Sequence, residues 1–177
     1  ERKAYVYDSI FIVSKIYYIY EKYAVKKFDL IITATPYIRD KFQKIHSNVI
    51  DISNFPILEE FIEIKNGIKK ENTIVYIGGI SEIRGIRQLI KSLEHCKTDV
   101  RLKLAGKFYS QSLRNEVIHY NGWRKVDELG YLNRIEIIKL LSEVKAGMVL
   151  FLPVPNYLDA QPIKMYEYMS SRLPVIA

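Results

Sequence analysis

Short apolar runs alternate with amphipathic segments along residues 73–152, and this alternation restricts the possible folds more than any other feature. Three runs have the length and composition of buried strands: Thr73–Ile77, Val100–Ala105 and Ala146–Leu152. Between them, apolar residues recur at helical spacing over residues 134–144 and at Ile86, Leu89, Ile90 and Leu93. Strands that alternate with helices are typical of a parallel sheet with helices on both faces. We therefore predict an α/β fold with a Rossmann-like, doubly wound parallel sheet.

The pattern is less regular in the middle and at the end of this region. We predict a short helix near Ser110–Asn115 and, directly after it, a strand at Val117–Tyr120. A last helix is expected to start at Pro162, because proline suits the first helical turn, where its missing N–H costs nothing. Its apolar stripe is predicted to consist of Ile163, Tyr166 and Met169. The apolar run Leu173–Ala177 indicates a strand after this helix.

The first 72 residues are organised differently. We predict an amphipathic helix at residues 9–27, a strand at 29–34, a capped helix from Thr35-Pro36 onwards and a second strand at 48–53. Residues 57–72 are polar and rich in turn-forming residues, which favours a linker. The sequence therefore predicts one domain in residues 1–56, a linker in 57–72 and a second domain in 73–177.

Composition excludes several classes of protein. Hydrophobic residues make up 49% of the chain and charged residues 27%, which is ordinary for a folded soluble protein. No apolar run reaches the roughly 18 residues that a membrane-spanning helix needs. Cys96 is the only cysteine, so no internal disulfide can form. The three histidines match no metal-ligand spacing, and we expect chemistry without a metal.

The chain is basic, with 27 Lys and Arg against 20 Asp and Glu and a formal charge of +7. Such a surface is either simply solvated, or serves an anionic substrate or an anionic membrane. The aromatic residues follow no RNA-binding signature, so no nucleic-acid partner is expected. No secretory signal is visible, and the chain opens with Glu1 rather than Met, which indicates a piece of a longer protein. We expect a cytoplasmic protein and leave open a peripheral contact at the inner face of the membrane.

Two carboxylates lie eight residues apart across the start of the last predicted helix. Asp159 precedes the helix, where backbone N–H groups and the helix dipole attract anions, and Glu167 lies one to two turns inside it. This arrangement can hold a sugar nucleotide, with phosphate at the helix start and hydroxyls on the carboxylates. The alternatives are a helix cap worth about 1 kcal/mol for Asp159 and a surface carboxylate for Glu167.

This segment resembles the donor-binding motif of family 4 retaining glycosyltransferases, which have the GT-B fold. Asp159 and Glu167 take the two acidic places of the motif, and Leu173–Ala177 resembles its Gly-x-Pro-Val-Ile end. A variant common in bacterial members that build surface polysaccharide is matched by Pro162, Lys164, Glu167, Tyr168 and Met169. The chain departs from the motif in two places. The first acid is Asp rather than Glu, and Arg172 stands where the family usually has Gly, so the turn into the last strand is expected to differ.

A glycine-rich loop, Gly78–Gly85, lies between a predicted strand and a helix. It lacks the G-x-G-x-x-G dinucleotide fingerprint. It is either a tight turn that needs glycine or a phosphate loop in which Arg84 offers a bidentate fork to a diphosphate. The resemblance extends here, because Gly78, Ile80 and Gly85 match the family's pattern and Arg84 replaces its Lys. Gly79 stands where the family usually has an Arg.

Three further residues have two interpretations each. Gly122 and Trp123 resemble the family's strand–Gly loop beside the nucleotide base, although Trp123 is equally suited to packing or simple exposure. Lys164 either faces the phosphates or is a solvated helix residue.

The resemblance implies a retaining hexosyltransferase that moves a sugar from a nucleotide diphosphate sugar to an acceptor hydroxyl in polysaccharide or glycolipid synthesis. Arg84 and the helix start before Ile163 would take the diphosphate charge, Glu167 would hold the ribose and Asp159 would contact the donor sugar. The implied partners are the nucleotide-sugar donor and a polysaccharide or lipid-linked acceptor, with no cofactor.

The same resemblance gives the two domains their identities. Residues 1–56 look like the C-terminal remnant of the family's N-terminal acceptor domain, and residues 73–177 like its donor domain, truncated at the C-terminus. We therefore expect the fragment to bind donor weakly and to turn over little.

Three alternatives remain. A GT-B nucleotide-sugar epimerase would form product without an acceptor. A non-catalytic nucleotide-binding module that docks on a membrane would lose lipid binding at high salt. A nucleic-acid binder would show a steep salt dependence and bind no nucleotide sugar.

Overall fold

The computed structural model of the chain describes residues 2–61, 71–155 and 157–177. The chain forms two compact units, Glu1–Asn54 and Phe55–Ala177. The division lies just before the predicted linker of residues 57–72, of which 62–70 fall outside the described residues. The start of that linker contains a short 3₁₀ helix, η1 (Leu58–Phe61).

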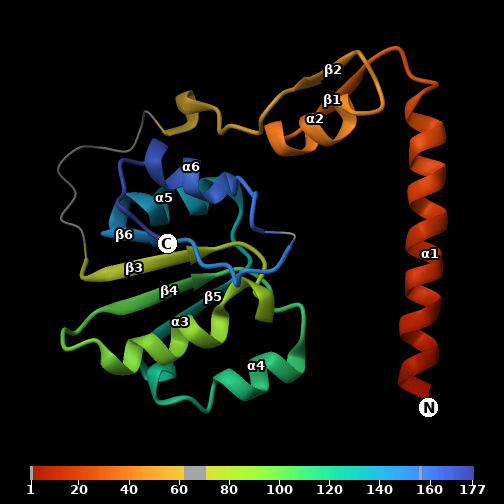
Figure 1. The fold of residues 1–177 in the computed structure, drawn as a ribbon. Coiled ribbons are helices and arrows are strands. Elements are labelled where there is room, and N and C mark those ends of the chain that lie inside the picture. Colours follow the sequence, from red (N-terminus) through yellow and green to blue (C-terminus); the bar gives the residue numbers. More distant parts are fainter. Residues whose placement is uncertain (1, 62–70, 156) are drawn as a thin grey trace. The chain divides into compact units, whose positions relative to one another are not determined.

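The first unit consists of two helices and a parallel strand pair (Figure 1): α1 (Arg2–Val25), β1 (Ile31–Thr33), α2 (Pro36–Gln43) and β2 (Val49–Asp51). The predicted cap of α2 is confirmed, because the Thr35 hydroxyl accepts a hydrogen bond from the Ile38 N–H at 3.3 Å. The predicted amphipathic character of α1 is wrong. Its described apolar residues lie on more than one side of the helix and are exposed, among them Ile16, Tyr17, Ile19 and Tyr20.

The second unit is built on five parallel strands in the order β5-β4-β3-β6-β7. Their bounds are β3 (Thr73–Ile77), β4 (Arg101–Ala105), β5 (Val126–Gly130), β6 (Ala146–Met148) and β7 (Val175–Ile176). The chain starts at the central strand, adds two strands on one side, then returns and adds two on the other. The predicted doubly wound parallel sheet is confirmed, with its switch point at β3.

Helices cover both faces of this sheet (Figure 1): α3 (Ile86–Ser92) and α4 (Gln111–Val117) on one face, α5 (Arg134–Glu143) and α6 (Ile163–Ser170) on the other. Three more 3₁₀ helices are η2 (Glu82–Arg84), η3 (Leu93–His95) and η4 (Asn121–Lys125). Because successive strand residues point to opposite faces, Tyr76 packs in the core under α3 and Val75 in the core under α5 and α6. The predicted apolar face of α3 is confirmed, since all four of its residues are buried.

The strand predicted at Val117–Tyr120 is wrong. Val117 is the last residue of α4, and its side chain is buried together with that of Leu113, one helical turn earlier. The third strand is β5, which pairs only with β4 and carries polar residues such as Asp127 and Glu128. Because this strand lies at the edge of the described sheet, it needs no continuous apolar run, and its sequence therefore lacks the signal by which the other strands were predicted.

The predicted apolar stripe of α6 is also wrong. Ile163 and Met169 are 44% and 58% exposed, whereas Tyr168 is completely buried. The Tyr168 ring packs against Gly147, where an added Cβ would lie 2.3 Å from the ring, and its hydroxyl accepts a hydrogen bond from the Ile77 N–H at 3.1 Å. Tyrosine can point inward here because its hydroxyl finds a backbone partner.

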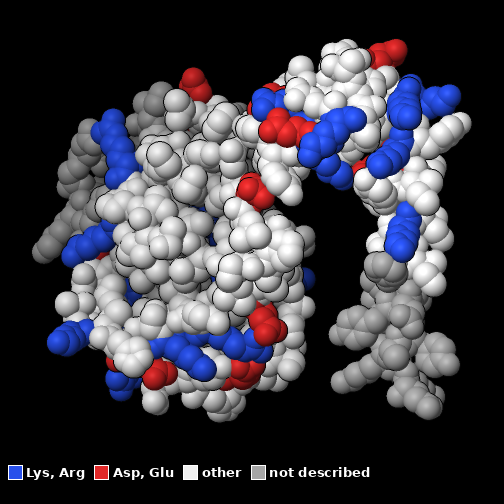
Figure 2. All heavy atoms as spheres, viewed as in Figure 1, with Lys and Arg blue, Asp and Glu red and all other residues white. Residues whose placement is uncertain are grey.

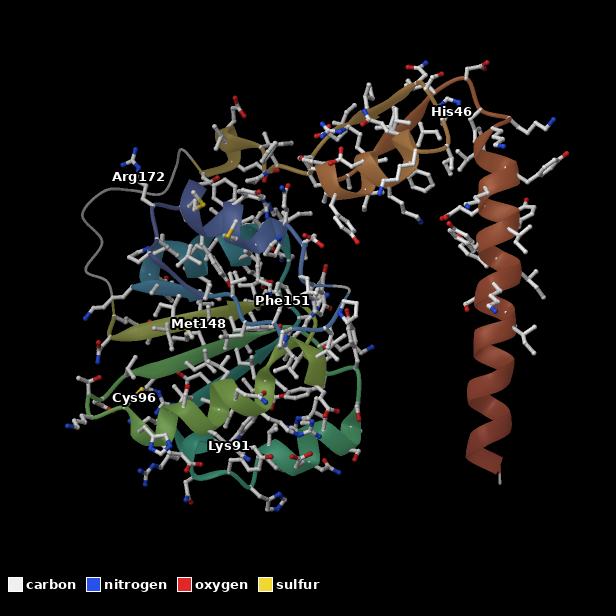
Figure 3. The ribbon with its side chains drawn as sticks, viewed as in Figure 1. His46, Lys91, Cys96, Met148, Phe151 and Arg172 are labelled. Carbon is white, nitrogen blue, oxygen red and sulfur yellow. The ribbon has the colours of Figure 1, made fainter. Side chains whose placement is uncertain are left out.

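The turn after α6 keeps the form that glycine usually provides, although Arg172 stands there and a different turn was expected. The φ of Arg172 is +56°, in the left-handed region that favours glycine. The Arg172 N–H donates to the Met169 carbonyl and the Leu173 N–H to the Tyr168 carbonyl, both at 2.9 Å, which is the Schellman arrangement. Arg172 lies on the loop between α6 and β7 (Figure 3), so the turn that usually contains glycine forms here with a strained arginine.

Opposite charges lie side by side over α3 and α4 (Figure 2), where Arg87 pairs with Glu82 and Glu116, and Arg114 pairs with Glu128. These contacts are on the face that lies away from the pocket described below. Within the described parts of the chain, none of the helices is both long enough and apolar enough to cross a membrane.

Candidate functional site

A pocket of about 460 Å³ lies at the carboxyl ends of the central strands. Gly78 and Gly79 line it after β3, Gly106 and Lys107 after β4, and Tyr131 and Leu132 after β5. Arg134 and Ile137 of α5 and Glu167 of α6 close one side. Open parallel sheets bind ligands at this edge, next to the switch point. Three residues that the sequence singled out, Gly78, Gly79 and Glu167, therefore lie at one pocket.

The loops after β3 and β4 touch through their backbones. A Cβ added to Gly106 would lie 2.0 Å from the Gly78 carbonyl oxygen, and the φ of Gly106 is +152°. Above Gly79 lies the hydroxyl of Tyr109, 2.3 Å from where a Cβ would be. Glycine is needed at Gly106 because no side chain fits between the two backbones, whereas at Gly79 the exposed Tyr109 side chain could move aside.

Two cationic side chains lie beside Gly78. A Cβ added there would be 3.7 Å from Nη1 of Arg84 and 3.9 Å from Nζ of Lys164. Arg84 donates from Nη1 to the Gly79 carbonyl and from Nε to the Tyr157 hydroxyl, both at 3.2 Å. Tyr157 in turn stacks on Phe151, the residue shown beyond β6 in Figure 3, with ring centroids 4.2 Å apart. In the described parts of the chain, Arg84 has no carboxylate partner.

Lys164 is the less ordinary of the two. Its Nζ is buried, lies 3.8 Å from the centroid of the Tyr76 ring and has no hydrogen-bond partner among the described residues. Burial and, to a smaller extent, the nearby Arg84 charge lower the pKa of Lys164 to about 7, while the Glu167 charge opposes this shift. An anion that binds near this amine would therefore favour its charged form.

Glu167 belongs to a second cluster. Its Oε1 accepts a hydrogen bond from Nη1 of Arg134, and the Arg134 guanidinium also donates from Nε to Glu60 at 2.7 Å. Sequence reasoning missed Arg134. Its available signal was the capping box Asn133–Glu136, in which both reciprocal hydrogen bonds form and which marks Arg134 as the first residue of α5. Because the third strand was predicted at Val117–Tyr120 rather than at β5, the sequence did not show that α5 begins beside the pocket.

Arg84 and Lys164 lie beside Gly78 without lining the pocket themselves, and four other predicted site residues also lie outside the pocket lining. Asp159 is on an exposed turn, Pro162 is the N-cap of α6 and Ile163 is 44% exposed. Gly85 joins η2 to α3 with φ of +68°, and a Cβ there would lie 3.2 Å from that of Leu150. The ligand contacts proposed for these residues stay predictions.

Gly122 and Trp123 lie in η4, against α3. A Cβ added to Gly122 would be 1.9 Å from the Ile90 carbonyl oxygen, and Trp123 packs against the core under α3. Neither residue lines the pocket, and the structure gives both a packing role. The residues that follow β5 and do line the pocket are Tyr131 and Leu132.

The sequence of this unit matches a known family. Residues 59–177, more than half of the chain, match the family model described as glycosyl transferases group 1. The chain belongs to this family. A search of curated proteins found no match.

Solved structures share the fold of this glycosyl transferase family member. TarM of S. aureus, in complex with UDP and other ligands, is 20% identical with a TM-score of 0.66 over 88% of this chain and 31% of TarM. HepE of Anabaena, in complex with UDP and glucose, is 18% identical with a TM-score of 0.65 over 84% of this chain and 44% of HepE. Sucrose-phosphate synthase of Thermosynechococcus elongatus is 17% identical with a TM-score of 0.63 over 88% of this chain and 42% of the synthase. These likenesses confirm the predicted GT-B, Rossmann-like fold, and the chain spans less than half the length of each protein.

A metal site was not expected in this glycosyl transferase family member. Among the residues that the structure describes, no three His, Cys, Asp or Glu side chains are grouped so that they could hold a metal ion. The chemistry without a metal stays a prediction.

Proposed function

We propose that this chain is the donor-binding part of a retaining glycosyltransferase, which binds a nucleotide diphosphate sugar in the pocket and transfers the sugar to an acceptor hydroxyl. The observation that carries the proposal is the pair of cationic side chains, Arg84 and Lys164, beside Gly78 at the pocket edge. In the described residues neither has an acidic hydrogen-bond partner, so an anion from outside the protein would be needed to offset their charge. The family membership supports a sugar nucleotide as that anion.

The chemistry needs a stabilised leaving group. When the bond between the sugar and the diphosphate breaks, negative charge develops on the leaving phosphate oxygen. Positive groups that are already in place stabilise that charge without reorganising. Arg84 would take this role directly, with its fork of N–H donors, and Lys164 would add its charge from behind Gly78. The two cations would thereby do the work that a metal ion does in other phosphate sites.

The remaining roles follow the family resemblance. Glu167 would accept hydrogen bonds from the ribose hydroxyls and Asp159 would contact the donor sugar. We propose a hexose as the sugar, a polysaccharide or lipid-linked molecule as the acceptor, and a cytoplasmic location. A peripheral membrane contact is proposed for the basic residues at the end of α1 and the turn that follows, Lys22, Lys26 and Lys27.

A nucleotide-binding screen tests the proposal. The chain is titrated with UDP, GDP, ADP and their common sugar derivatives while its thermal unfolding is followed, because a ligand at a hundred times its dissociation constant adds about 2.7 kcal/mol of stability. We expect one nucleotide to raise the unfolding temperature, and the Arg84→Met variant to lose this shift.

The matched control is Arg87→Met, which removes the same charge three residues away. Arg87 pairs with Glu82 and Glu116 rather than facing the pocket, so this variant should keep the shift. The absence of a shift with every nucleotide, or an equal loss in both variants, would contradict the proposal.

A further inference from the structure

We propose that Arg134 is a positioning residue that orients the Glu167 carboxylate toward the donor ribose, and that Glu60 holds Arg134 in place. This inference rests on the proposed function, since it assigns a second layer of residues to the same site. Neither Arg134 nor Glu60 belongs to the donor-binding motif or to the glycine-rich loop.

The contacts of Arg134 fix its guanidinium from two sides. Nε and Nη2 donate to one oxygen of Glu60, at 2.7 and 2.5 Å, and Nη1 donates to Oε1 of Glu167. The guanidinium carbon lies 5.0 Å from the centroid of the Phe61 ring. Because a guanidinium is planar and its N–H groups form a rigid fork, binding at Glu60 determines where Nη1 points. Glu60 therefore acts on Glu167 through the arginine.

Glu167 is placed to receive a ligand. It lines the pocket although its side chain is only 14% exposed. Arg134 occupies Oε1, and among the described residues Oε2 accepts no hydrogen bond. One oxygen is thus held by the protein while the other remains for hydroxyl donors. A carboxylate accepts stronger hydrogen bonds from hydroxyls than a neutral group does.

The charge of this cluster selects the kind of group it binds. Two carboxylates share one arginine, so the cluster carries a net charge of −1 and would repel phosphate. It would instead attract neutral donors, and paired hydroxyls of a ribose fit that requirement. The pocket therefore separates the two ends of a nucleotide diphosphate, with phosphates toward Arg84 and the sugar diol toward Glu167.

The test measures how much binding depends on the ribose hydroxyls. Affinities of UDP, GDP and ADP and of their 2′,3′-dideoxy analogues are compared by calorimetry. For the nucleotide that binds, we expect the wild-type chain to prefer the ribose form about tenfold, which equals about 1.4 kcal/mol. In Arg134→Met this preference should fall to about twofold while the dideoxy form binds as before.

Two further variants separate positioning from mere stabilisation. Arg134→Lys keeps the charge without the fork and should restore part of the preference. Glu60→Gln keeps the shape of the side chain, leaves Arg134 and Glu167 intact, and should lower the preference about threefold, which tests the idea even where Arg134→Met fails to fold. Arg114→Met, which breaks an ion pair with Glu128 outside the pocket, is the matched control and should leave the preference unchanged.

The outcomes distinguish this inference from the proposed function. If Arg134→Met weakens both forms equally, or if the wild-type chain binds nucleotide without any preference for ribose, Arg134 does not position Glu167 for the diol and the inference is overturned. If the wild-type chain binds no nucleotide, the proposed function itself is overturned.

Discussion

Two charged clusters border the same pocket and differ in how complete they are. The first, Arg84 with Lys164, brings two cations together with only neutral groups as hydrogen-bond or ring partners in the described structure. The second, Glu60–Arg134–Glu167, places one cation between two carboxylates, each of which accepts a hydrogen bond from it. Both lie on loops and helices at the carboxyl edge of the sheet, but they differ in burial as well as in charge, because the Lys164 amine is buried and the second cluster keeps some exposure to water.

This difference indicates which cluster depends on a ligand to offset its charge. A half-buried cation without an acidic partner makes the folded state less stable, so its presence is better explained by a ligand than by structure. The Glu60–Arg134–Glu167 cluster, in contrast, satisfies itself and should stabilise the ligand-free protein. Substitutions in the first cluster should therefore weaken binding more than they lower stability, whereas substitutions in the second should lower both modestly.

The largest expected effect is at Arg84. We expect Arg84→Met to weaken binding of the nucleotide sugar about 100-fold, because losing a charged donor to a diphosphate removes about 2–3 kcal/mol. Its free energy of unfolding should stay within about 1 kcal/mol of wild type, since only hydrogen bonds to neutral groups are lost. Calorimetry and urea unfolding measure the two quantities. A loss of stability without a loss of affinity would reverse the roles that we assign to the clusters.

The next effect is the pH dependence of binding through Lys164. Its pKa of about 7 in the ligand-free fold means that the amine loses its charge as the pH rises through 7, and a bound diphosphate favours the charged amine. Affinity for a nucleotide sugar, whose diphosphate has no group that titrates near pH 7, should therefore fall about tenfold between pH 6.5 and 8.5. Tyr76 beside the amine does not titrate in this range, because burial raises its pKa to about 12. Lys164→Met should abolish the dependence, and an unchanged slope in that variant would exclude Lys164 as its source.

The same amine should make stability depend on pH in the opposite direction. Between pH 7 and about 10.5 the unfolded chain binds the Lys164 proton and the folded chain does not, so the free energy of unfolding should rise with pH across this interval. Lys164→Met should accordingly raise the unfolding temperature more at pH 6 than at pH 9. Thermal unfolding of both proteins at the two pH values checks this. An equal change at both would mean that the amine is not kept neutral by burial.

The Glu60–Arg134–Glu167 cluster should respond more modestly. Arg134→Met leaves two carboxylates without their shared cation, and we expect it to lower the free energy of unfolding by about 1 kcal/mol, since all three side chains keep some exposure to water. The loss should shrink in high salt, which screens the repulsion between the two carboxylates. A loss independent of salt would point to packing on Phe61 rather than to charge.

The smallest effect is expected outside both clusters, at Arg172. Arg172→Gly removes the cost of a left-handed conformation, roughly 1–2 kcal/mol, against a backbone-entropy cost of glycine of about 0.5–1 kcal/mol. The free energy of unfolding should rise by about 0.5–1 kcal/mol, and nucleotide affinity should not change. The variant therefore serves as a control for the two clusters, because it shows how a change in stability alone affects the measured nucleotide affinity. A change in affinity would link this turn to the pocket.

Much of the fold was accessible from the sequence where local chemistry and burial agree. The strand Thr73–Ile77 and the buried face of α3 were predicted correctly because the central strand and the helix packed on it have continuous apolar signals. The edge strand β5 was missed because a strand that pairs with one neighbour in the described sheet does not need a continuous apolar run. On α6 the apolar stripe misled, because the inward Tyr168 is held by a hydrogen bond to the Ile77 backbone, 91 residues away in the sequence.

The parallel α/β class, the glycine loop with Arg84 and the place of Glu167 on a helix after a turn could all be predicted from the sequence alone. These follow from local rules, since residue spacing, backbone freedom and charge are carried by neighbours in the chain. That Lys164 is buried without a hydrogen-bond partner among the described residues, and that Arg134 joins Glu60 to Glu167, became visible only in the folded structure. Those facts depend on segments that meet across the sheet, so burial and electrostatic partners, which set the charge of each group, exist only once the strands have assembled.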